Sequence, residues 1–546
     1  MPSPVTPDRR VAIQSAPAVK LGHAVSVAGP ITTIALNAEA AAAAAPRAEI
    51  GSLVAIRTRA ARVIGIVSSL KELPDRPAAG KILIELVLVG ELSDQEAAFT
   101  RGVTHFPCIG DEAFSATHHD HTLVYGHEGQ TTIDVGTLYQ DPAIPARLLA
   151  EELFSKHFAI VGTTGCGKSS ALTGIVHRAL ESHQYAHVLV LDMHGEYQRA
   201  FGARAEVISA GNLLLPFWLL NFQELRSVLT SPDDHYDAQS EILCDAIVHA
   251  KKRYADAAVG RVRSRVFESA SGTVDTPTPF RLSDLTGYID EQLGRLERPY
   301  PTLAYRRLKL RIEALAIDPR FGFMFGNPNM EDNMVDILAQ LFRIPNDGRP
   351  VTVVELSTVP EEILDVVILL LARLTFDLAV WSDGALPVLL VCEEAHRYAP
   401  ADEKKGYLPT KQALSRIAKE GRKYGLSLAL LTQRPSELEA TILSQCSTIV
   451  AMRLSTETDQ KVMRANVHDS TFGVLEYLPL LADREAIVIG CGAPMPMRIK
   501  FRSLPDTSLP GLGQRKFIER WNKPNMDRRK LEETVARWRG TTNRRG

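Results

Sequence analysis

The feature that most restricts the fold is a glycine-rich segment between an apolar run and a helix-forming run, Gly162-Thr163-Thr164-Gly165-Cys166-Gly167-Lys168-Ser169. It satisfies the pattern GxxxxGK[ST] in the strand, turn and helix context that a phosphate-binding loop requires. Glycines let backbone N–H groups turn toward bound phosphates, and the N-terminus of the following helix adds partial positive charge. The segment therefore predicts a nucleotide-binding α/β domain.

The residues at the end of this segment predict the cofactors, ATP and Mg²⁺. Lys168 is expected to reach the β- and γ-phosphates, and the hydroxyl of Ser169 is expected to ligate Mg²⁺. A further candidate is Asp192, which ends the next apolar run along the chain. The residues predicted to bind nucleotide are Gly162, Thr163, Thr164, Gly165, Cys166, Gly167, Lys168, Ser169, Ser170 and Asp192.

Two acids follow the apolar run LPVLLVC, at Glu393 and Glu394. Ligands of open α/β sheets bind at the carboxyl ends of the strands, which is where these side chains are expected. Glu393 stands where a Walker B Asp is usual and is predicted to support Mg²⁺, whereas Glu394 is predicted to polarise the attacking water. The alternative is an exposed pair of carboxylates at a strand end.

Two further strand ends carry polar residues. Gln433, in LLTQRP, is predicted to sense the γ-phosphate or the water, with a simple exit from strand to loop as the alternative. Asp192 and Glu196 lie in DMHGEY, where they would assist the metal or the water, or else form a structural turn around the glycine.

The pattern of apolar runs predicts three regions. Short β-branched runs, among them TTIDVGTL, predict a small antiparallel barrel over residues 1–146. Continuous apolar strands alternating with helices predict a parallel sheet covered on both faces over residues 147–505, with a helical insertion at about 220–334. A basic tail, residues 506–546, has one expected helix near DRRKLEETVARW and a net charge of +7 from Gln514 onward. The alanine-rich segment at residues 37–49 is interpreted as a surface loop.

Composition limits other classes of function. The 62 Lys and Arg and 64 Asp and Glu leave a formal charge of -2, so contact with nucleic acid requires locally placed cations. Six separated cysteines without zinc spacing favour a reduced, cytoplasmic chain, and no apolar stretch is long enough to predict a membrane span. A metal site at His118-His119-Asp120-His121 is rejected, because adjacent ligands in one loop rarely converge tetrahedrally.

The motifs GTTGCGKSS, DMHGEY, VCEEAH and LLTQRPSEL, in this order, resemble the HerA family of the HerA/FtsK superfamily. The resemblance covers nearly the whole chain and implies a RecA-like P-loop ATPase with an N-terminal HAS barrel. It also implies a homohexamer that pumps double-stranded DNA. The string EEAH is similar to the DEAH box of two-lobed helicases as well, but a single phosphate loop argues against a second lobe.

The resemblance also implies two basic residues at the nucleotide. Arg422 matches an arginine finger given to the neighbouring subunit, with Arg416 as a rival, and a solvated helix-end cation is the alternative. Lys156 matches a residue that acts within its own chain, although a Lys where Arg is typical weakens a bidentate phosphate contact.

Cations on loops or on the insertion would contact DNA phosphates without reading bases. The candidates are Lys404 and Lys405 after the acidic strand, and Arg306, Arg307, Lys309 and Arg311 in the insertion; solvated helix faces are the alternative. For the basic tail, the resemblance implies instead that it braces an adjacent subunit.

The sequence thus predicts an ATP-driven DNA translocase or helicase. The resemblance implies a nuclease or other effector partner on the barrel, in DNA end processing or antiviral defence. Two alternatives remain. One is a ring scaffold that binds ATP and regulates a nuclease or NAD-consuming partner with little translocation. The other is a secretion-coupling ATPase, which the missing membrane anchor disfavours.

Overall fold

The computed structural model describes most of the chain in twelve stretches. These are residues 18–36, 49–72, 82–93, 98–126, 131–209, 211–230, 235–259, 273–326, 331–402, 404–466, 472–511 and 527–539. The alanine-rich segment, apart from Glu49, and residues 512–526 and 540–546 of the basic tail lie outside the described residues. The chain forms two compact units. The first consists of Met1–Ala179, Thr432–Ser436 and Cys446–Ser503, and the second of Leu180–Leu431, Glu437–Gln445 and Leu504–Gly546.

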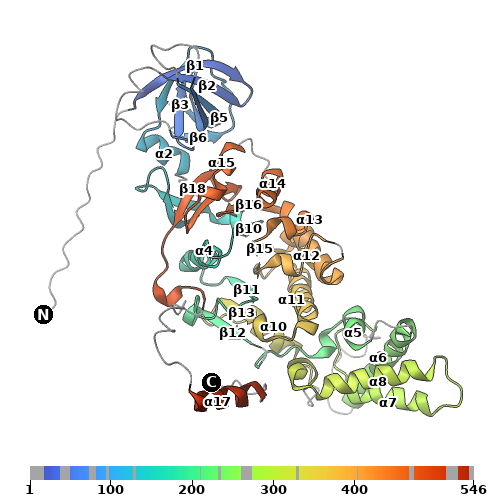
Figure 1. Cartoon of the computed structure of the whole chain (residues 1–546). Helices are drawn as coiled ribbons and strands as arrows, with labels where there is room; N and C mark the ends of the chain where they lie inside the picture. The colour runs from blue at the N-terminus through green and yellow to red at the C-terminus, as the bar shows by residue number, and fades with distance from the viewer. Residues whose placement is uncertain are drawn as a thin grey trace. The chain divides into compact units, whose positions relative to one another are not determined.

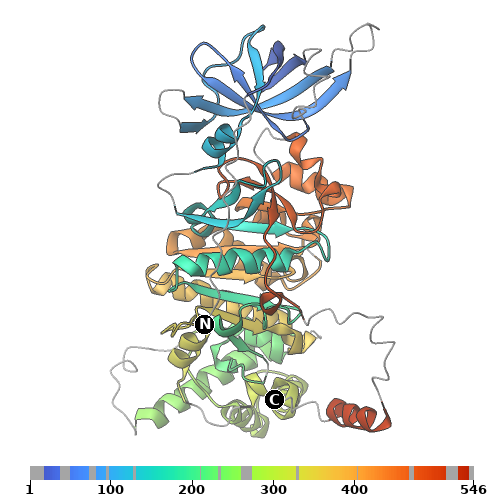
Figure 2. The ribbon, with the colours of Figure 1, turned by 90° about the vertical axis from the view of Figure 1, so that its left-hand side faces the viewer.

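The N-terminal part of the first unit is a closed antiparallel barrel (Figures 1 and 2, blue strands). Six strands follow one another around the ring in the order β2-β1-β7-β3-β4-β5, and β5 pairs with β2 to close it. Their apolar side chains, such as Ile34, Ile56 and Ile84, fill the interior. A seventh strand, β6, pairs with β5 outside the ring. The strands are β1 Lys20–Ala28, β2 Ile31–Leu36, β3 Leu53–Arg57, β4 Arg62–Glu72, β5 Ile82–Ser93, β6 Ala98–Arg101 and β7 Glu112–Ser115.

One strand predicted for the barrel lies elsewhere. The run TTIDVGTL forms β8, Thr132–Leu138, which pairs with β9, Pro145–Leu149, and with β18, Met497–Phe501. It therefore joins the sheet that carries the phosphate loop, and the sheet begins before the predicted boundary at residue 147. Alternating apolar residues identify a strand but not its partner, whereas β7, which completes the ring, is only four residues long.

The rest of the first unit supplies the strand that leads into the phosphate loop. β10, His157–Val161, pairs in parallel with β16, Cys446–Ala451. Beyond β16 the pairing is antiparallel, through β17, Glu485–Gly490, to β18. This antiparallel edge departs from the wholly parallel sheet that we predicted. The helices of this unit are α2 His118–Tyr125, α3 Ala150–Phe154, most of α4 Lys168–Ser182, α14 Glu457–Asn466 and α15 Phe472–Leu475.

The second unit contains five parallel strands in the order β12-β13-β11-β14-β15. They are nearly continuous apolar runs, as expected for strands that are covered on both faces. The strands are β11 His187–Asp192, β12 Ala205–Ile208, β13 Val351–Glu355, β14 Val388–Cys392 and β15 Leu426–Thr432. Helices α10 Met334–Phe342, α11 Glu361–Trp381, α12 Leu408–Glu420 and α13 Ala440–Ser444 accompany them.

The described residues between Leu220 and Met334 form helices and no strand, as predicted for the insertion. They are α5 Phe222–Leu229, α6 Tyr236–Val259, α7 Leu282–Gly294, α8 Thr302–Ile317 and α9 Gly322–Phe325, with α6, α7 and α8 side by side (Figure 1). A buried ion pair fastens the insertion to α11. The guanidinium of Arg373 donates to both carboxylate oxygens of Glu224, at 2.8 and 2.9 Å, and to the carbonyl of Leu219.

The helix predicted in the basic tail is confirmed as α17, Arg528–Arg539. Among the described helices, none combines the length and the apolar character needed to cross a membrane.

Candidate functional site

The phosphate loop in the first unit is shaped by glycines and by the strand beside it. Gly165 and Gly167 have backbone φ angles of +79° and +107°, which residues other than glycine rarely adopt. A Cβ on Gly162 would lie 2.7 Å from Sγ of Cys166, so this position accepts only glycine. The amide of Gly162 donates to the carbonyl of Thr432, the last residue of β15. The loop is thus set at the carboxyl end of β10 by its backbone.

The side chains of the loop point where phosphates are expected. Nζ of Lys168 donates to the carbonyls of Gly162 and Thr163, at 2.9 and 3.3 Å, so the ammonium lies across the loop. Ser169 lies in the first turn of α4. At the start of the loop, the hydroxyl of Thr164 donates to Oε1 of Gln433. The structure therefore brings Gln433 to the phosphate loop, as its predicted role requires.

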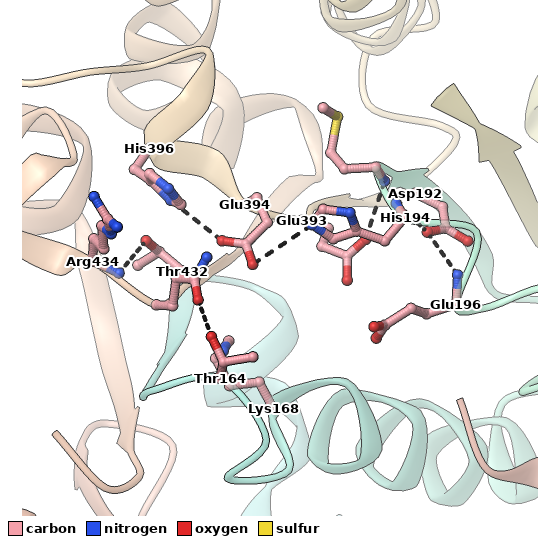
Figure 3. A network of polar contacts seen from close by, with 12 residues as sticks. Thr164, Lys168, Asp192, His194, Glu196, Glu393, Glu394, His396, Thr432 and Arg434 are labelled. Atoms are coloured by element: carbon pink, nitrogen blue, oxygen red, sulfur yellow. Dashed lines mark hydrogen bonds and ion pairs between the residues drawn. The ribbon is translucent and has the colours of Figure 1, made fainter. Parts of the chain in front are cut away.

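The predicted acidic pair lies in the second unit, directly after β14 (Figure 3). Glu393 is buried, and its Oε2 accepts from the amide of Met193 at 3.1 Å. Burial, together with the nearby carboxylates of Asp192 and Glu196, raises the pKa of Glu393 to about 9. Tyr398 also donates to the carbonyl of Glu393 at 2.8 Å. Glu393 is therefore a firmly held, neutral carboxyl group at pH 7, and not an exposed acid.

Glu394 adopts a left-handed backbone conformation, with φ 49° and ψ 44°, which is uncommon for a residue other than glycine. Its buried carboxylate lies between two histidines, as Figure 3 shows: Nδ1 of His396 is 3.3 Å from Oε2, and Nε2 of His194 is 3.9 Å from Oε1. Within the described residues, Oε2 accepts no hydrogen bond. Apart from its contact with His396, this buried oxygen thus keeps acceptor capacity, as a general base requires.

Asp192 has the structural role that we had kept as an alternative. Its buried carboxylate accepts from four consecutive backbone amides, those of His194, Gly195, Glu196 and Tyr197, at 2.8 to 3.2 Å. The DMHGEY segment therefore folds around this side chain. These bonds occupy the oxygens that a metal or nucleotide contact would need, so the prediction of Asp192 as a nucleotide ligand is not favoured by the geometry.

The two candidates for the arginine finger, Arg416 and Arg422, make different side-chain contacts. The guanidinium of Arg416 stacks on the ring of Phe376, 4.3 Å from its centre, and lies 3.7 Å from Glu420. Arg422, in the turn after α12, is exposed and donates to the carbonyl of Gln445. β15 then runs seven residues, roughly 23 Å, before Gln433. Arg422 therefore lies at the far end of β15 from its own chain's Gln433.

Lys156 precedes β10, and its ammonium pairs with the carboxylate of Glu152. The hydrogen bond to Glu152 is the main cause that raises the pKa of Lys156. β10 is five residues long, roughly 16 Å, and the phosphate loop follows its other end. The expected contact between Lys156 and nucleotide on its own loop is therefore not favoured by this arrangement.

The candidate DNA contacts are partly used within the chain. In the insertion, Lys309 pairs with Asp290 at 2.6 Å and Arg311 donates to the carbonyl of Val228. Arg306 and Arg307 are exposed on α8. Lys404 and Lys405 are exposed after β14, with Lys405 3.9 Å from Asp402.

No group of three or more His, Cys, Asp or Glu side chains suited to a metal ion occurs in the described part of the chain. The HHDH segment instead begins α2, where Asp120 completes a capping box with Thr117 and pairs with Arg62. An Mg²⁺ ion bound mainly through phosphates needs few protein ligands, and hydroxyl and carboxyl oxygens suit it. Ser169 and Glu393 fit that donor set.

Sequence reasoning missed two arginines at the phosphate loop. The carbonyl of Arg453, just after β16, accepts from the amide of Thr163 at 2.8 Å. The amide of Arg484, just before β17, donates to the carbonyl of Cys166 at 3.0 Å. No local motif marks either residue, and only the pairing of β10 with β16 and of β16 with β17 brings them to the loop.

A glycine-rich loop between a buried strand and a helix, with acids ending a parallel strand, defines a P-loop ATPase domain of the RecA-like class. Residues 133–375 match the family model of the helicase HerA central domain. This match covers less than half of the chain, and it shows that residues 133–375 are similar to that domain.

Relatives of known sequence extend the similarity. A probable helicase of Methanocaldococcus jannaschii is 26% identical over 418 residues, which cover 74% of this chain and 73% of the relative. The DNA double-strand break repair helicase HerA of Pyrococcus furiosus is 24% identical over 462 residues, 76% of this chain and 78% of its own. Among solved structures, VirB4 of Thermoanaerobacter pseudethanolicus aligns over 69% of this chain and 98% of its own, with a TM-score of 0.48 and 14% identity.

Proposed function

We propose that this chain is the ATPase subunit of a homohexameric ring that moves along double-stranded DNA. The observation that carries the proposal is the buried Glu394, whose Oε2 accepts no hydrogen bond among the described residues, in a chain whose segment similar to the HerA central domain also contains a complete phosphate loop. The DNA substrate is inferred from the HerA relatives. The contacts with DNA phosphates are assigned to the exposed residues Lys404, Lys405, Arg306 and Arg307.

In the proposed reaction, each residue acts at a stated atom of the nucleotide or water. The Lys168 ammonium moves from the loop carbonyls to the β- and γ-phosphates. Oε2 of Glu394 accepts the proton of the attacking water, and Gln433 orients that water or the γ-phosphate. Ser169 and Glu393 would hold Mg²⁺, which neutralises charge on the phosphates when it is bound. The positive charge of such an ion would lower the pKa of Glu393, and its carboxyl group would release its proton to water.

Arg422 is proposed to complete the site of a neighbouring subunit. It lies at the amino end of β15, whereas the phosphate loop and Gln433 lie at carboxyl ends of strands. A guanidinium so placed reaches a second chain's nucleotide more readily than its own, and an arginine finger contributes about 10³ to 10⁵ in rate. Lys156 stays a candidate only for the role within its own chain that the resemblance implies, and its pairing with Glu152 at the amino end of β10 does not add to that role.

The effector is proposed to dock on the barrel, in DNA end processing or antiviral defence. A pull-down with the full-length chain and with a chain lacking the barrel tests this docking. Capture of a nuclease or other effector only by the full-length chain supports it, and equal capture by both contradicts it.

Displacement of a protein roadblock from duplex DNA tests the motor. The wild-type ring should displace the roadblock with ATP, and Glu394→Gln should abolish displacement while nucleotide still binds. Lys168→Ala should abolish both. If a partner is activated by ATP without any displacement, the chain is a ring scaffold and the motor proposal is wrong.

A further inference from the structure

Arg484 is held against the phosphate loop by its backbone. Its amide donates to the carbonyl of Cys166 at 3.0 Å, and its carbonyl accepts from the amide of Phe501 at 2.8 Å. Its φ is +65°, in the left-handed region that residues other than glycine rarely adopt. A strained turn that is bonded on both sides fixes where the side chain starts.

The side chain of Arg484 leaves this turn next to Gly167. A Cβ placed on Gly167 would lie 3.6 Å from Cγ of Arg484, so the aliphatic stem packs on the last glycine of the loop. Farther out, Nη1 donates to the hydroxyl of Ser503. The side chain is only partly buried, and no carboxylate ion pair to Arg484 occurs among the described residues. Its charge is therefore not neutralised by a neighbouring acid.

The electrostatics of the loop favour an anion. Lys168, Arg453 and Arg484 all lie at the loop, and within the described parts of the chain the only carboxylate paired with them is that of Asp483, 2.8 Å from Arg453. Asp483 is 68% exposed, which screens its attraction. Three cationic side chains that belong to one glycine-rich loop and its neighbours favour a polyphosphate anion there.

From this geometry we infer that Arg484 is a nucleotide-binding residue that contacts the α- and β-phosphates of the nucleotide on its own chain. This inference rests on the proposed ATP binding and adds a residue to it. Gln433, expected at the γ-phosphate, bonds to Thr164 at the start of the loop. Arg484 packs on Gly167 at the opposite end, where the N-terminus of α4 begins. An arginine at that end faces the phosphates that ATP and ADP share.

The test measures equilibrium binding of ATP and of ADP to the full-length protein. Arg484→Asn removes the cation and keeps a residue that tolerates positive φ. We expect it to weaken both nucleotides about 10- to 100-fold, the range for hydrogen bonds to charged groups. Ser503→Ala and Arg502→Ala are the controls. The first removes only the hydroxyl partner, the second removes an exposed cation paired with Asp134 at 3.0 Å, and each should stay within about twofold of wild type.

The outcomes separate this inference from the proposed function. If wild type binds neither nucleotide, or if Lys168→Ala binds both as wild type does, the proposed function fails. If wild type binds and Arg484→Asn binds equally well, only the inference fails. A loss for ATP alone would contradict the placement at the α- and β-phosphates. A melting temperature that falls equally for Arg484→Asn and Ser503→Ala, with a similar loss of binding, would show a purely structural role.

Discussion

At the scale of single residues, the acid cluster contains carboxyl groups in different states. Glu393 is neutral at pH 7 because burial and the nearby acids Asp192 and Glu196 disfavour its charge. The carboxylate oxygens of Asp192 accept hydrogen bonds from four backbone amides. Glu394, one residue after Glu393, has a left-handed backbone that turns its side chain toward His396 instead. The local backbone therefore separates a proposed metal ligand from a proposed base.

His396 is expected to position Glu394 without contacting substrate. We predict that His396→Ala lowers kcat for ATP hydrolysis about tenfold, equivalent to about 1.4 kcal/mol, with KM unchanged, because Oε2 of Glu394 loses its orienting neighbour. His396→Asn should recover part of the rate, since its amide nitrogen lies near the place of Nδ1. Steady-state kinetics checks the split between kcat and KM.

His194→Ala is the matched control, because His194 is 46% exposed and its ring is farther from the carboxylate. Its kcat should stay close to that of wild type. An unchanged kcat in His396→Ala, or an equal loss in both variants, would contradict the positioning role.

At the scale of elements, the insertion is fastened by two buried charged side chains. Arg373 of α11 donates hydrogen bonds to the carboxylate of Glu224 in α5, and Glu224 is only 1% exposed. Lys251 of α6 is 7% exposed, and its ammonium donates to the carbonyls of Val274 and Thr276, at 2.8 and 2.5 Å. Burial lowers the pKa of Lys251 to about 8. Both side chains connect segments that the hydrophobic pattern alone would leave loosely joined.

The Arg373 contact gives a prediction about stability. Arg373→Met leaves the buried carboxylate of Glu224 unpaired and should destabilise the insertion by about 3 to 5 kcal/mol. Adding Glu224→Gln removes that charge but keeps an oxygen for the helix cap, so the double variant should be more stable than Arg373→Met. Hydrogen exchange of α5 measures both. A double variant less stable than the single one would refute the explanation.

The Lys251 contact predicts a dependence on pH. Below about pH 8 the ammonium is charged in both the folded and the unfolded state, so the penalty for burying it is complete. Between about pH 8 and 10.5 the unfolded chain binds a proton that the folded chain has lost, so stability rises with pH.

Between about pH 8 and 10.5, the melting temperature of wild type should therefore rise relative to that of Lys251→Met. The other titrating groups are the same in both proteins, so their effects on the two melting temperatures cancel when one is subtracted from the other. Circular dichroism from pH 7 to 10.5 checks it, and a constant gap would contradict the prediction.

At the scale of the whole molecule, the proposed chemistry is shared between copies of the chain. Arg422 lies at the amino end of the strand whose carboxyl end carries Gln433. Under this proposal, hydrolysis on one copy of the chain needs a cation from a second copy. Activity should then depend on assembly.

Mixing two inactive variants tests this sharing. Arg422→Ala and Lys168→Ala should each have little ATPase activity alone, and rings assembled from both should regain part of it, because some interfaces pair an intact loop with an intact finger. ATPase rates at several mixing ratios, with the particle mass, measure the effect. Arg416→Ala, whose side chain stacks on Phe376, should remain largely active. No recovery on mixing would place Arg422 within its own subunit's chemistry, or outside it.

The sequence by itself determined the parts that depend on neighbouring residues. The phosphate loop, the acids after β14 and the helical insertion all follow from local spacing, since a motif of eight residues or a helical period is complete within one segment. The same local signals misassigned β8 to the barrel, because alternation gives a strand its two faces but leaves its partner open.

Tertiary structure alone decided what lies next to these motifs. Arg484 is more than 300 residues from Gly167 in the chain and reaches it through strand pairing. The structural use of Asp192, the neutral state of Glu393 and the position of Lys156 away from its own loop depend likewise on backbone direction and burial. These quantities arise only when distant segments pack together, because desolvation and through-space charge act over distances in space and not along the sequence.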